Sequence, residues 1–467
     1  MRLPADKPLV RCAHLCLLLV MGASACSVSD GVLGSIAGGD GLPVTVDGGI
    51  TSDGGVSVAT CPLTSPRVTI ATHDTCSGRL AASRFSNALC TCGNLQLSNS
   101  LSTHGFDSRQ GPYQVGQSDD SGAAVGVNGN YSLLAGATTV GGSFSIAGGG
   151  DLQRVGQLQS RGDFYCAGNI LVAGPATVSR NAWLGGNFSG LGALTVDGDC
   201  HHVGLLTALP VSVAGTNQRQ PVIVAKPCPC AVSDLLDISA LVDAAKVKND
   251  NDSLGVSGDR LASVAGADEW TLSCGRIYLS QISGVGNLII HVTGMVALFI
   301  DGSINLVGSL SFDVVPGAEI DVFVKGDLNV QGALSLASKD RPAAGRLWVG
   351  GKNAITLPSP WIGNLYAPQA HVSATVGLEV WGSIFVGDFA GGAYASFIFD
   401  RAVLAAGTNC EAPRPPAGVC NQCQWCSGGA ACVAESCGPC QTDGDCCSLS
   451  SCSNGSCVPL LEAGGTS

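Results

Sequence analysis

The chain has 467 residues, of which 65 are glycine and only 12% are charged, so its composition is neither that of a disordered protein nor that of a helical repeat. Its formal net charge is −12 at pH 7, and an N-terminal leader with three basic residues and one acidic residue makes the rest of the chain more acidic still. Because nucleic-acid-binding proteins need clustered Lys and Arg, this balance argues against a nucleic-acid partner. The same negative charge also argues against binding to an anionic lipid surface.

Residues 1–25 have the parts of a bacterial export signal: a basic start, a short apolar run at 15–21, and Ala-Ser-Ala before Cys26. The apolar run is too short to span a bilayer. The small residues ahead of Cys26 predict either plain cleavage or a lipoprotein signal in which Cys26 is the lipidated first residue. We expect lipidation of Cys26, although Ala23 occupies a position where a lipobox usually has Leu. Residues 26–60, rich in Gly, Ser and Asp, predict a flexible tether.

The cysteine content supports export. Two of the 23 cysteines lie in the leader, Cys26 is the lipidation candidate, and we expect the others to form two closed disulfide sets in an oxidising compartment. The triple Cys spacing at 420–426 also resembles metal-ligand spacing, but zinc sites usually combine separated Cys pairs or His, and this tail has no His. The disulfide candidates are Cys61, Cys76, Cys90, Cys92, Cys166, Cys200, Cys228, Cys230, Cys274 and Cys410 in the body, and Cys420, Cys423, Cys426, Cys432, Cys437, Cys440, Cys446, Cys447, Cys452 and Cys457 in the tail.

Two Cys-x-Cys elements, at 90–92 and 228–230, are suited to pair with each other. In an extended segment residues i and i+2 point the same way, so each element offers two sulfurs on one side. Pro227 and Pro229 keep the second element extended. We predict at least one disulfide between the elements; the alternative, a metal site of four thiolates, is disfavoured by export.

A glycine-centred phrase recurs through residues 124–405. In the first half Phe144, Phe164 and Phe188 each follow a glycine by two positions, and in the second half similar phrases begin at Gly302 and Gly326. A period of about 22 to 25 residues is typical of a β-solenoid, whose coils bury their inward side chains by stacking. We therefore expect an all-β fold, a right-handed parallel β-helix, with the three phenylalanines stacked in register.

The apolar runs between the glycines have the length and composition of strands. Residues 288–292, 296–300, 310–314 and 320–324 are rich in β-branched and aromatic residues and are closed by Gly, Pro or Asp. Alternation within 310–314 predicts one buried and one wet face. An antiparallel sandwich also has short strands, but it has no reason to repeat its phrases at a fixed spacing.

The other segments divide the chain further. Residues 61–123 predict a cysteine-containing lead-in that caps the open end of the solenoid. Residues 205–270 interrupt the repeat with one amphipathic helix at 234–248, for which Ser233 is the expected N-cap. The full division is 124–204 and 271–405 for about four and about six coils, 406–419 for a Pro-rich hinge, 420–457 for a cysteine-rich module, and 458–467 for a tail.

Several clusters resemble functional sites but have simpler interpretations. The Arg-Gly-Asp tripeptide at 161–163 matches an integrin-binding motif, yet it coincides with a repeated glycine corner. His201 and His202 point to opposite faces of a strand and are poorly placed to share one metal ion. The Asn-Asp-Asn-Asp run at 249–252 offers oxygen ligands for calcium, but it lacks the glycine and distal Glu of an EF-hand loop.

Three acidic residues, Glu319, Asp321 and Asp327, are candidates for the paired carboxylates of a glycosidase. Alternation or a corner predicts that Asp321 and Asp327 face solvent, and the pattern places no Arg or Lys with them. No Gly-x-Ser-x-Gly elbow or phosphate loop precedes a helix in the sequence. We therefore predict no catalytic, cofactor or metal residue.

Several short phrases carry a resemblance to known proteins: Leu236-Asp237-Ile238, Asn249-Asp250-Asn251, Cys274-Gly275-Arg276-Ile277-Tyr278, and the runs at 296–302 and 365–370. They resemble exported, uncharacterised proteins of myxobacterial type. The Tyr-Ala-Pro phrase at 366–368, followed by Trp381-Gly382-Ser383-Ile384-Phe385 and Phe399-Asp400, is also similar to choice-of-anchor surface domains and, more distantly, to bactofilins.

This resemblance implies a β-helix and a cell-surface setting but transfers no catalytic residue. The chain departs from bactofilins, which are cytoplasmic and poor in cysteine. The Cys440-to-Cys457 spacing of the tail separately resembles knottins and other small disulfide modules.

The sequence thus predicts a non-catalytic surface lipoprotein, a structural or adhesive β-helical scaffold that presents a disulfide-rich knob. Two alternatives remain: a polysaccharide lyase or hydrolase, since parallel β-helices also carry such enzymes, and an inhibitor or ligand-binding role for the C-terminal module. The expected partners are envelope polysaccharide or another surface protein, with membrane contact through the lipid anchor alone and no cofactor. Ser27 follows Cys26, so the Asp that retains lipoproteins at the inner membrane is absent and the outer membrane is the expected location.

Overall fold

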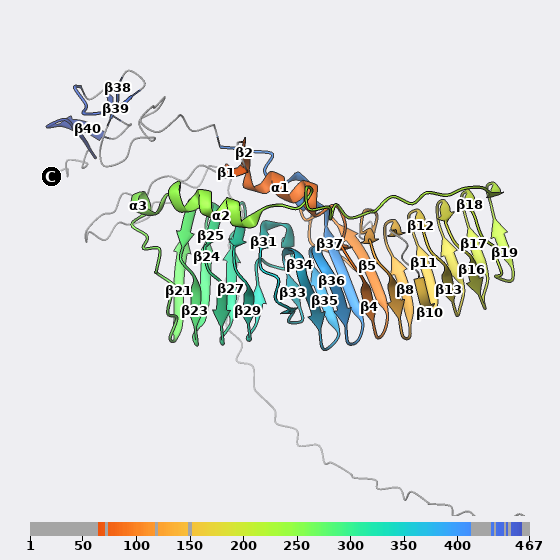
Figure 1. Ribbon diagram of the computed structural model, residues 1–467. Helices are drawn as coiled ribbons and strands as arrows, with labels where there is room; N and C mark the ends of the chain where they lie inside the picture. The colour runs from red at the N-terminus through yellow and green to blue at the C-terminus, as the bar shows by residue number, and fades with distance from the viewer. Residues whose placement is uncertain are drawn as a thin grey trace, which may run out of the picture. The chain divides into compact units, whose positions relative to one another are not determined.

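The computed structural model describes residues 64–70, 73–116, 120–147, 152–411, 431–433, 436–442, 445–446 and 450–459. Its body is a parallel β-solenoid whose coils have three faces, which confirms the predicted fold class (Figure 1). Each coil contributes one strand to a 13-stranded sheet, here called face 3. In stacking order face 3 contains β21 (Ala267–Leu272), β24 (Asn287–Val292), β27 (Leu310–Val314), β30 (Leu334–Ser335), β33 (Trp361–Ile362), β35 (Leu378–Trp381), β37 (Ala395–Asp400), β5 (Leu101–Phe106), β8 (Ala137–Val140), β11 (Gln157–Ser160), β14 (Ala176–Val178), β17 (Leu194–Val196) and β19 (Val211–Val213).

Faces 1 and 2 largely share one sheet because two strands, β34 and β36, bend across both. Face 1 contains β22 (Gly275–Leu279), β25 (Met295–Ile300), β28 (Glu319–Val324), β31 (Gly345–Val349), the first parts of β34 (Asn364–Ala374) and β36 (Ile384–Gly391), β3 (Leu89–Thr91), β6 (Val125–Val127), β9 (Phe144–Ile146), β12 (Phe164–Cys166), β15 (Ala182–Leu184), β18 (Cys200–His202) and β20 (Asn217–Arg219). Face 2 contains β23 (Ile282–Gly284), β26 (Ile304–Leu306), β29 (Leu328–Val330), β32 (Ile355–Thr356), the second parts of β34 and β36, β4 (Leu95–Leu97), β7 (Tyr131–Leu133), β10 (Leu152–Val155), β13 (Ile170–Val172) and β16 (Phe188–Gly190).

A few elements lie outside the three faces. They are the antiparallel pair β1 (Arg67–Ile70) and β2 (His73–Cys76), the helices α1 (Ser77–Arg84), α2 (Ile238–Val247) and α3 (Asn251–Leu254), the 3-10 turns η1 (Pro342–Ala344) and η2 (Arg401–Ala405), and, in the C-terminal region, two antiparallel hairpins, β38 (Ala431–Val433) with β39 (Ser436–Gly438) and β40 (Ser450–Ser453) with β41 (Ser456–Pro459).

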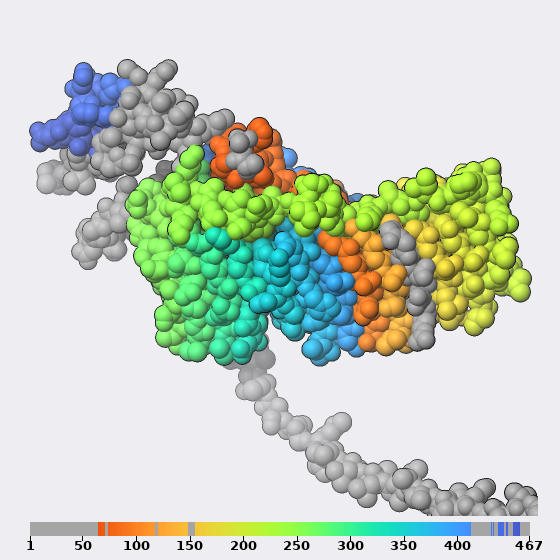
Figure 2. Space-filling model, in the orientation of Figure 1, coloured from red at the N-terminus to blue at the C-terminus, as the bar shows by residue number. Residues whose placement is uncertain are grey.

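The coils do not stack in chain order. The stack begins with β21, runs through the second half of the chain to β37, continues with β5 from the N-terminal part, and ends at β19. Figure 2 shows the result as the N-terminal coil, in orange, lying directly beside the C-terminal coils, in blue. The prediction that residues 61–123 cap an open end is therefore wrong, because β3, β4 and β5 each pair with a coil on both sides.

Coil length differs between the two halves. Residue numbers at equivalent positions advance by 18 per coil from Phe164 to Ala182 to Cys200, but by 25 from Ile320 to Gly345. The predicted period is thus too long for the first half and correct only for part of the second half. The pairing does not test the predicted right-handedness.

The stacking of the three phenylalanines is confirmed only in part. Phe144 and Phe164 are in register on face 1 with ring centroids 5.7 Å apart, but Phe188 pairs with Ile170 on face 2. The physical reason is the shorter coil, of which each of the three faces takes about a third. The sequence distance from Phe164 to Phe188 therefore spans one full coil and one further face. In β12, β14 and β17 the two end residues of a three-residue strand are buried and the middle residue is turned outward.

A long return segment follows from this coil order. The repeat continues to Arg219 at the far end of the stack, beyond the predicted boundary at residue 205, and the chain must then run back to β21 at the opposite end. The segment includes α2, which lies on β22, β25 and β28 (Figure 1) and buries Leu241, Val242 and Ala245. The helix begins later than predicted because Asp237, not Ser233, is its N-cap; the Asp237 carboxylate accepts from the Ala240 N–H.

The two Cys-x-Cys elements fasten this return segment to the middle of the stack. Both bridges form, Cys90–Cys228 and Cys92–Cys230, with Cα–Cα distances of 5.8 and 5.5 Å. The Asn128 side chain reinforces the join, because its amide donates to the Cys228 carbonyl and its oxygen accepts from the Cys228 N–H. The predicted staple is confirmed.

Other body cysteines divide into two groups. Cys76 is bridged to Cys410, and Cys274 is also disulfide-bonded. Cys166 and Cys200 are buried thiols, so their predicted disulfides are wrong. Both are buried in the core of face 1, where Cys166 is in register with Leu184 and Cys200 with Ala182, and a buried thiol packs there as a small apolar side chain. Cys61 lies outside the described residues.

The paired bridges generate a non-additive stability prediction. The two cysteines of each bridge are 138 positions apart in sequence. When one bridge is removed, the other still restricts the unfolded chain to nearly the same loop, so most of the entropic stabilisation remains. We expect the C92S/C230S variant to lose little stability and the variant lacking all four cysteines to lose about 4–5 kcal/mol in chemical denaturation. Equal losses for the first and second bridge would contradict this account.

Helix α2 is held to face 1 by Asp301, which predicts a pH dependence. Hydrogen bonds from Lys246, and also from Tyr278 and Lys325, lower the pKa of Asp301 to about 2. Because the folded pKa is depressed, the contribution is present above pH 3.8 and is lost as pH falls toward about 2. We expect Asp301→Asn to remove at most about 2 kcal/mol of unfolding free energy at pH 5 and much less at pH 2.5. The exposed Asp252→Asn serves as control, and equal losses at both pH values would contradict the assignment.

Candidate functional site

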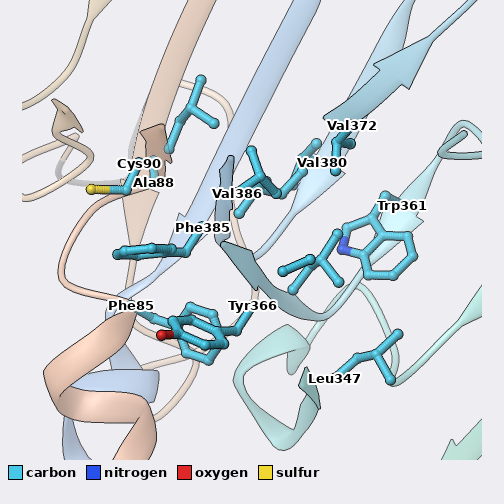
Figure 3. Close-up of a cluster of buried hydrophobic side chains, with 14 of the residues drawn as sticks. Phe85, Ala88, Cys90, Leu347, Trp361, Tyr366, Val372, Val380, Phe385 and Val386 are labelled. Atoms are coloured by element: carbon cyan, nitrogen blue, oxygen red, sulfur yellow. The ribbon is translucent and has the colours of Figure 1, made fainter. Parts of the chain in front are cut away.

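The outward side of face 1 is used for internal packing. Phe299, Phe323 and Trp348 stand in register on successive strands, with centroid distances of 5.0 and 5.7 Å. Phe85, next to α1, covers Trp348 at 5.1 Å. The same outward row continues through Tyr366 and Phe385, which Figure 3 shows grouped with Phe85 beside a helix.

The return segment also covers this row. Leu236 donates its N–H to the Tyr366 hydroxyl at 3.0 Å. Face 1 is thus closed to ligands where α1 and α2 lie on it, in the half of the stack formed by the second half of the chain.

Two of the three candidate catalytic acids, Asp321 and Glu319, lie on this covered face and pair with Arg346. Asp321 is fully buried and accepts from the Arg346 guanidinium at 2.6 and 3.0 Å and from Trp348 Nε1 at 3.0 Å. Glu319 lies 2.8 Å from the same guanidinium. Burial alone would lower the pKa of Arg346, but the charges of Asp321 and Glu319 raise it, so the group stays cationic.

Two sequence predictions about these residues are therefore wrong. Asp321 does not face solvent, and an arginine is placed with it, because helices outside the coil cover the side of the strand that alternation exposes. Asp327 does lie at a corner, where it accepts from the Asn353 side chain at 2.7 Å. The three acids do not converge on a cleft.

The other sequence motifs also have structural partners. Arg161 pairs with Asp120, and Asp163 accepts from the backbone and side chain of Asn181 on the next coil. His201 contacts Gln220 and His202 contacts the Gly204 carbonyl, both at 2.8 Å. In the 249–252 run, Asp250 binds Arg276 and Asn251 binds the backbone of Tyr278, so the run joins α3 to β22.

Face 3 carries an outward row of a different kind, here called the polar ladder. Its members occupy one register position on seven consecutive coils, with no charged residue among them. At about 4.8 Å per coil the row is about 29 Å long. The polar ladder is Ser396, Ser102, Thr139, Gln159, Thr177, Thr195 and Ser212.

Most side chains of the polar ladder have no hydrogen-bond partner within the part of the chain that the structure describes. Ser102 donates to Ser396 at 3.1 Å. Among the described residues, the other five side chains make no hydrogen bond, and all are partly or fully exposed. The ladder therefore offers uncompensated donors and acceptors at regular intervals to whatever contacts face 3.

Exposed leucines lie at the corner between faces 2 and 3 on three of the ladder coils. Leu134, Leu191 and Leu209 are 68%, 86% and 83% exposed, and we call them the aliphatic edge. Each lies in the turn that precedes a ladder strand, β8, β17 or β19. Leu191 and Leu209 lie on adjacent coils, with Leu134 three coils from Leu191, and neighbouring large apolar side chains at such exposure are typical of interaction surfaces.

A cluster of interacting side chains around Glu379 lies next to the Ser396 end of the polar ladder. Ser396 is in register with Glu379 of β35. Lys339 lies 2.7 Å from the Glu379 carboxylate and 4.9 Å from the centre of the Trp381 ring, and Trp381 Nε1 also donates to Glu379. Lys339 first, and then Trp381, lowers the pKa of Glu379. Tyr113 packs edge-on against Trp381 at 5.8 Å.

Sequence reasoning missed the ladder. Its signal is present as Thr177 and Thr195, which stand one coil apart, each between buried neighbours. The longer period expected from the glycine phrases concealed it, since that period does not bring these threonines into register.

The predicted sites at the chain ends are tested only in part. Cys26 and residues 420–426 lie outside the described residues. In the tail Cys440–Cys452 and Cys446–Cys457 are disulfides, which supports the predicted disulfide module. The sulfurs of Cys440, Cys446 and Cys457 lie within 4.8 Å of one another, but all three are committed to these bridges and so are not thiolate ligands. Within the described part of the chain, no helix is both long and apolar enough to cross a membrane.

Comparisons with known proteins give little further detail. A family model described as a domain of unknown function, DUF7305, matches residues 231–405, which include α2 and the coils up to η2. No curated protein matches. A solved structure, the ice binding protein from an Antarctic bacterium of the Flavobacteriaceae, is similar at 11% identity over 69% of this chain and 98% of that chain, with a TM-score of 0.14. The family model thus places an uncharacterised domain at residues 231–405, within the part of the chain that contains the second set of solenoid coils.

Proposed function

We propose that this protein is an exported, non-catalytic binding scaffold of the cell surface, held to the membrane by a lipid on Cys26. The observation that carries the proposal is the polar ladder, which repeats one neutral outward position over seven coils and whose side chains mostly lack a hydrogen-bond partner among the described residues. A repeated rigid row suits adhesion or scaffolding, because a stack of coils fixes the spacing of its groups before any ligand binds.

The dispositions of the acidic side chains favour binding over catalysis. A glycosidase needs two carboxyl groups facing one substrate. Asp321 is instead buried against Arg346, and Glu379 is closed in by Lys339 and Trp381. The disulfides support an oxidising, extracytoplasmic setting.

The anchor is tested by fractionating cells that express the wild-type chain or Cys26→Ala. We expect the wild type in the outer-membrane fraction and the variant in the soluble fraction, because removal of the modified cysteine removes the lipid. Ser27→Ala is the matched control and should remain with the membrane. Wild-type chain recovered from the culture medium with an unmodified Cys26 would reject lipidation in favour of plain secretion.

A further inference from the structure

We propose that face 3 binds an extended, uncharged polysaccharide chain that lies along the stacking direction of the coils. The polar ladder would hydrogen-bond the hydroxyl groups of the sugars, and the aliphatic edge would contact the apolar faces of the rings. This inference rests on the proposed non-catalytic surface function and names the ligand of its binding face.

The lack of charged side chains in the polar ladder and the aliphatic edge favours an uncharged ligand. Neither the seven ladder positions nor the three leucines of the edge include an acidic or basic side chain. An acidic polysaccharide or a nucleic acid requires cationic partners, whereas the whole chain carries a formal charge of −12. The nearby Arg161 is already paired with Asp120.

The regular spacing of the ladder side chains favours a polymer as the ligand. Consecutive ladder residues such as Gln159, Thr177 and Thr195 stand one coil apart, about 4.8 Å, which is on the scale of one sugar ring. The strands of Thr177 and Thr195 turn a single side chain outward on face 3, and the strand of Gln159 adds only Gln157, so the surface is one or two residues wide along these coils. Such a narrow surface matches a polymer chain better than a two-dimensional crystal face.

The combination of the polar ladder with the aliphatic edge favours a sugar polymer over other neutral polymers. A pyranose ring has hydroxyl groups around its rim and C–H groups on its faces, so it needs hydrogen-bonding and apolar contacts side by side. The structure supplies both in one coil, where Leu191 precedes Thr195 by four positions. Hydroxyl and amide side chains both donate and accept, as sugar hydroxyls require.

The test uses the full chain with Cys26→Ala, purified without detergent, and measures its depletion from solution by insoluble cellulose and chitin, with alginate as the acidic comparison. We expect saturable binding to a neutral polymer and none to alginate. The triple variant T139V/T177V/T195V keeps side-chain shape but removes three hydroxyls, and should weaken binding about a hundredfold, at about fivefold per hydroxyl.

Two further variants sharpen the result. Leu191→Ser and Leu209→Ser change exposed side chains that no fold contact requires, and should also weaken binding. Thr356→Val makes the same substitution on an exposed residue of face 2 and should leave binding unchanged. Unfolding midpoints equal to that of the parent protein show that the ladder variants remain folded.

Four outcomes would overturn the inference. The first two are that the parent protein binds no neutral polymer, or that the triple variant binds as well as the parent. The third is that the parent shows thermal hysteresis and the ladder variants lose it, which would assign the ladder to ice. The fourth is that the parent dimerises with increasing concentration and the ladder variants do not, which would assign the ladder to contact with a second copy. These leave the surface-scaffold proposal standing if the wild type fractionates with the membrane. Release of soluble sugars from the polymer would instead refute the non-catalytic function itself.

Discussion

The parallel pairing of β5 with β37, and of β3 and β4 with β36, is the constraint on which the rest of the structure depends. It joins residues 294 positions apart in sequence, such as Ser102 and Ser396, and makes one continuous stack from two sets of coils that the chain builds separately. Since each coil buries its inward side chains only against neighbours, this junction removes two open ends that would otherwise expose apolar residues and unpaired backbone groups. The return segment, its two disulfides and the cover of face 1 all follow from it.

The return segment explains why the faces differ chemically. It has to cross the stack from β20 back to β21, and it crosses on face 1, where Cys228 and Cys230 fasten it and α2 packs over the aromatic row. The outward positions of face 1 beneath α1 and α2 therefore contain large aromatic residues and even a buried Arg346–Asp321 pair, which belong to a protein interior. At the ladder coils, face 3 instead presents uncharged Ser, Thr and Gln side chains that remain partly or fully exposed.

The contacts that hold α2 and the return segment lie on face 1, whereas the proposed binding surface lies on face 3. The covered face anchors the helix through Asp301, Lys246 and Lys325, and locks the return segment by disulfides. The open face can then vary its outward residues at little cost, since a single exposed Ser or Thr contributes little to the core. A scaffold built this way can present a long, rigid row of groups without a cleft.

The sequence by itself determined the local features. Glycine corners, short β-branched runs and alternation predicted a stacked parallel β-solenoid, and the i, i+2 geometry of Cys90–Cys92 and Cys228–Cys230 predicted their cross-pairing, because these depend on neighbouring residues alone. Tertiary structure alone decided the order of the coils, which placed residues 89–106 inside the stack, and decided that Phe188 lies on a different face from Phe164. It also decided that Asp321 is buried and Thr177 is not, although both are outward residues of strands. The physical reason is that alternation fixes which side of a strand a residue occupies, whereas only the packing of distant segments fixes which side remains in water.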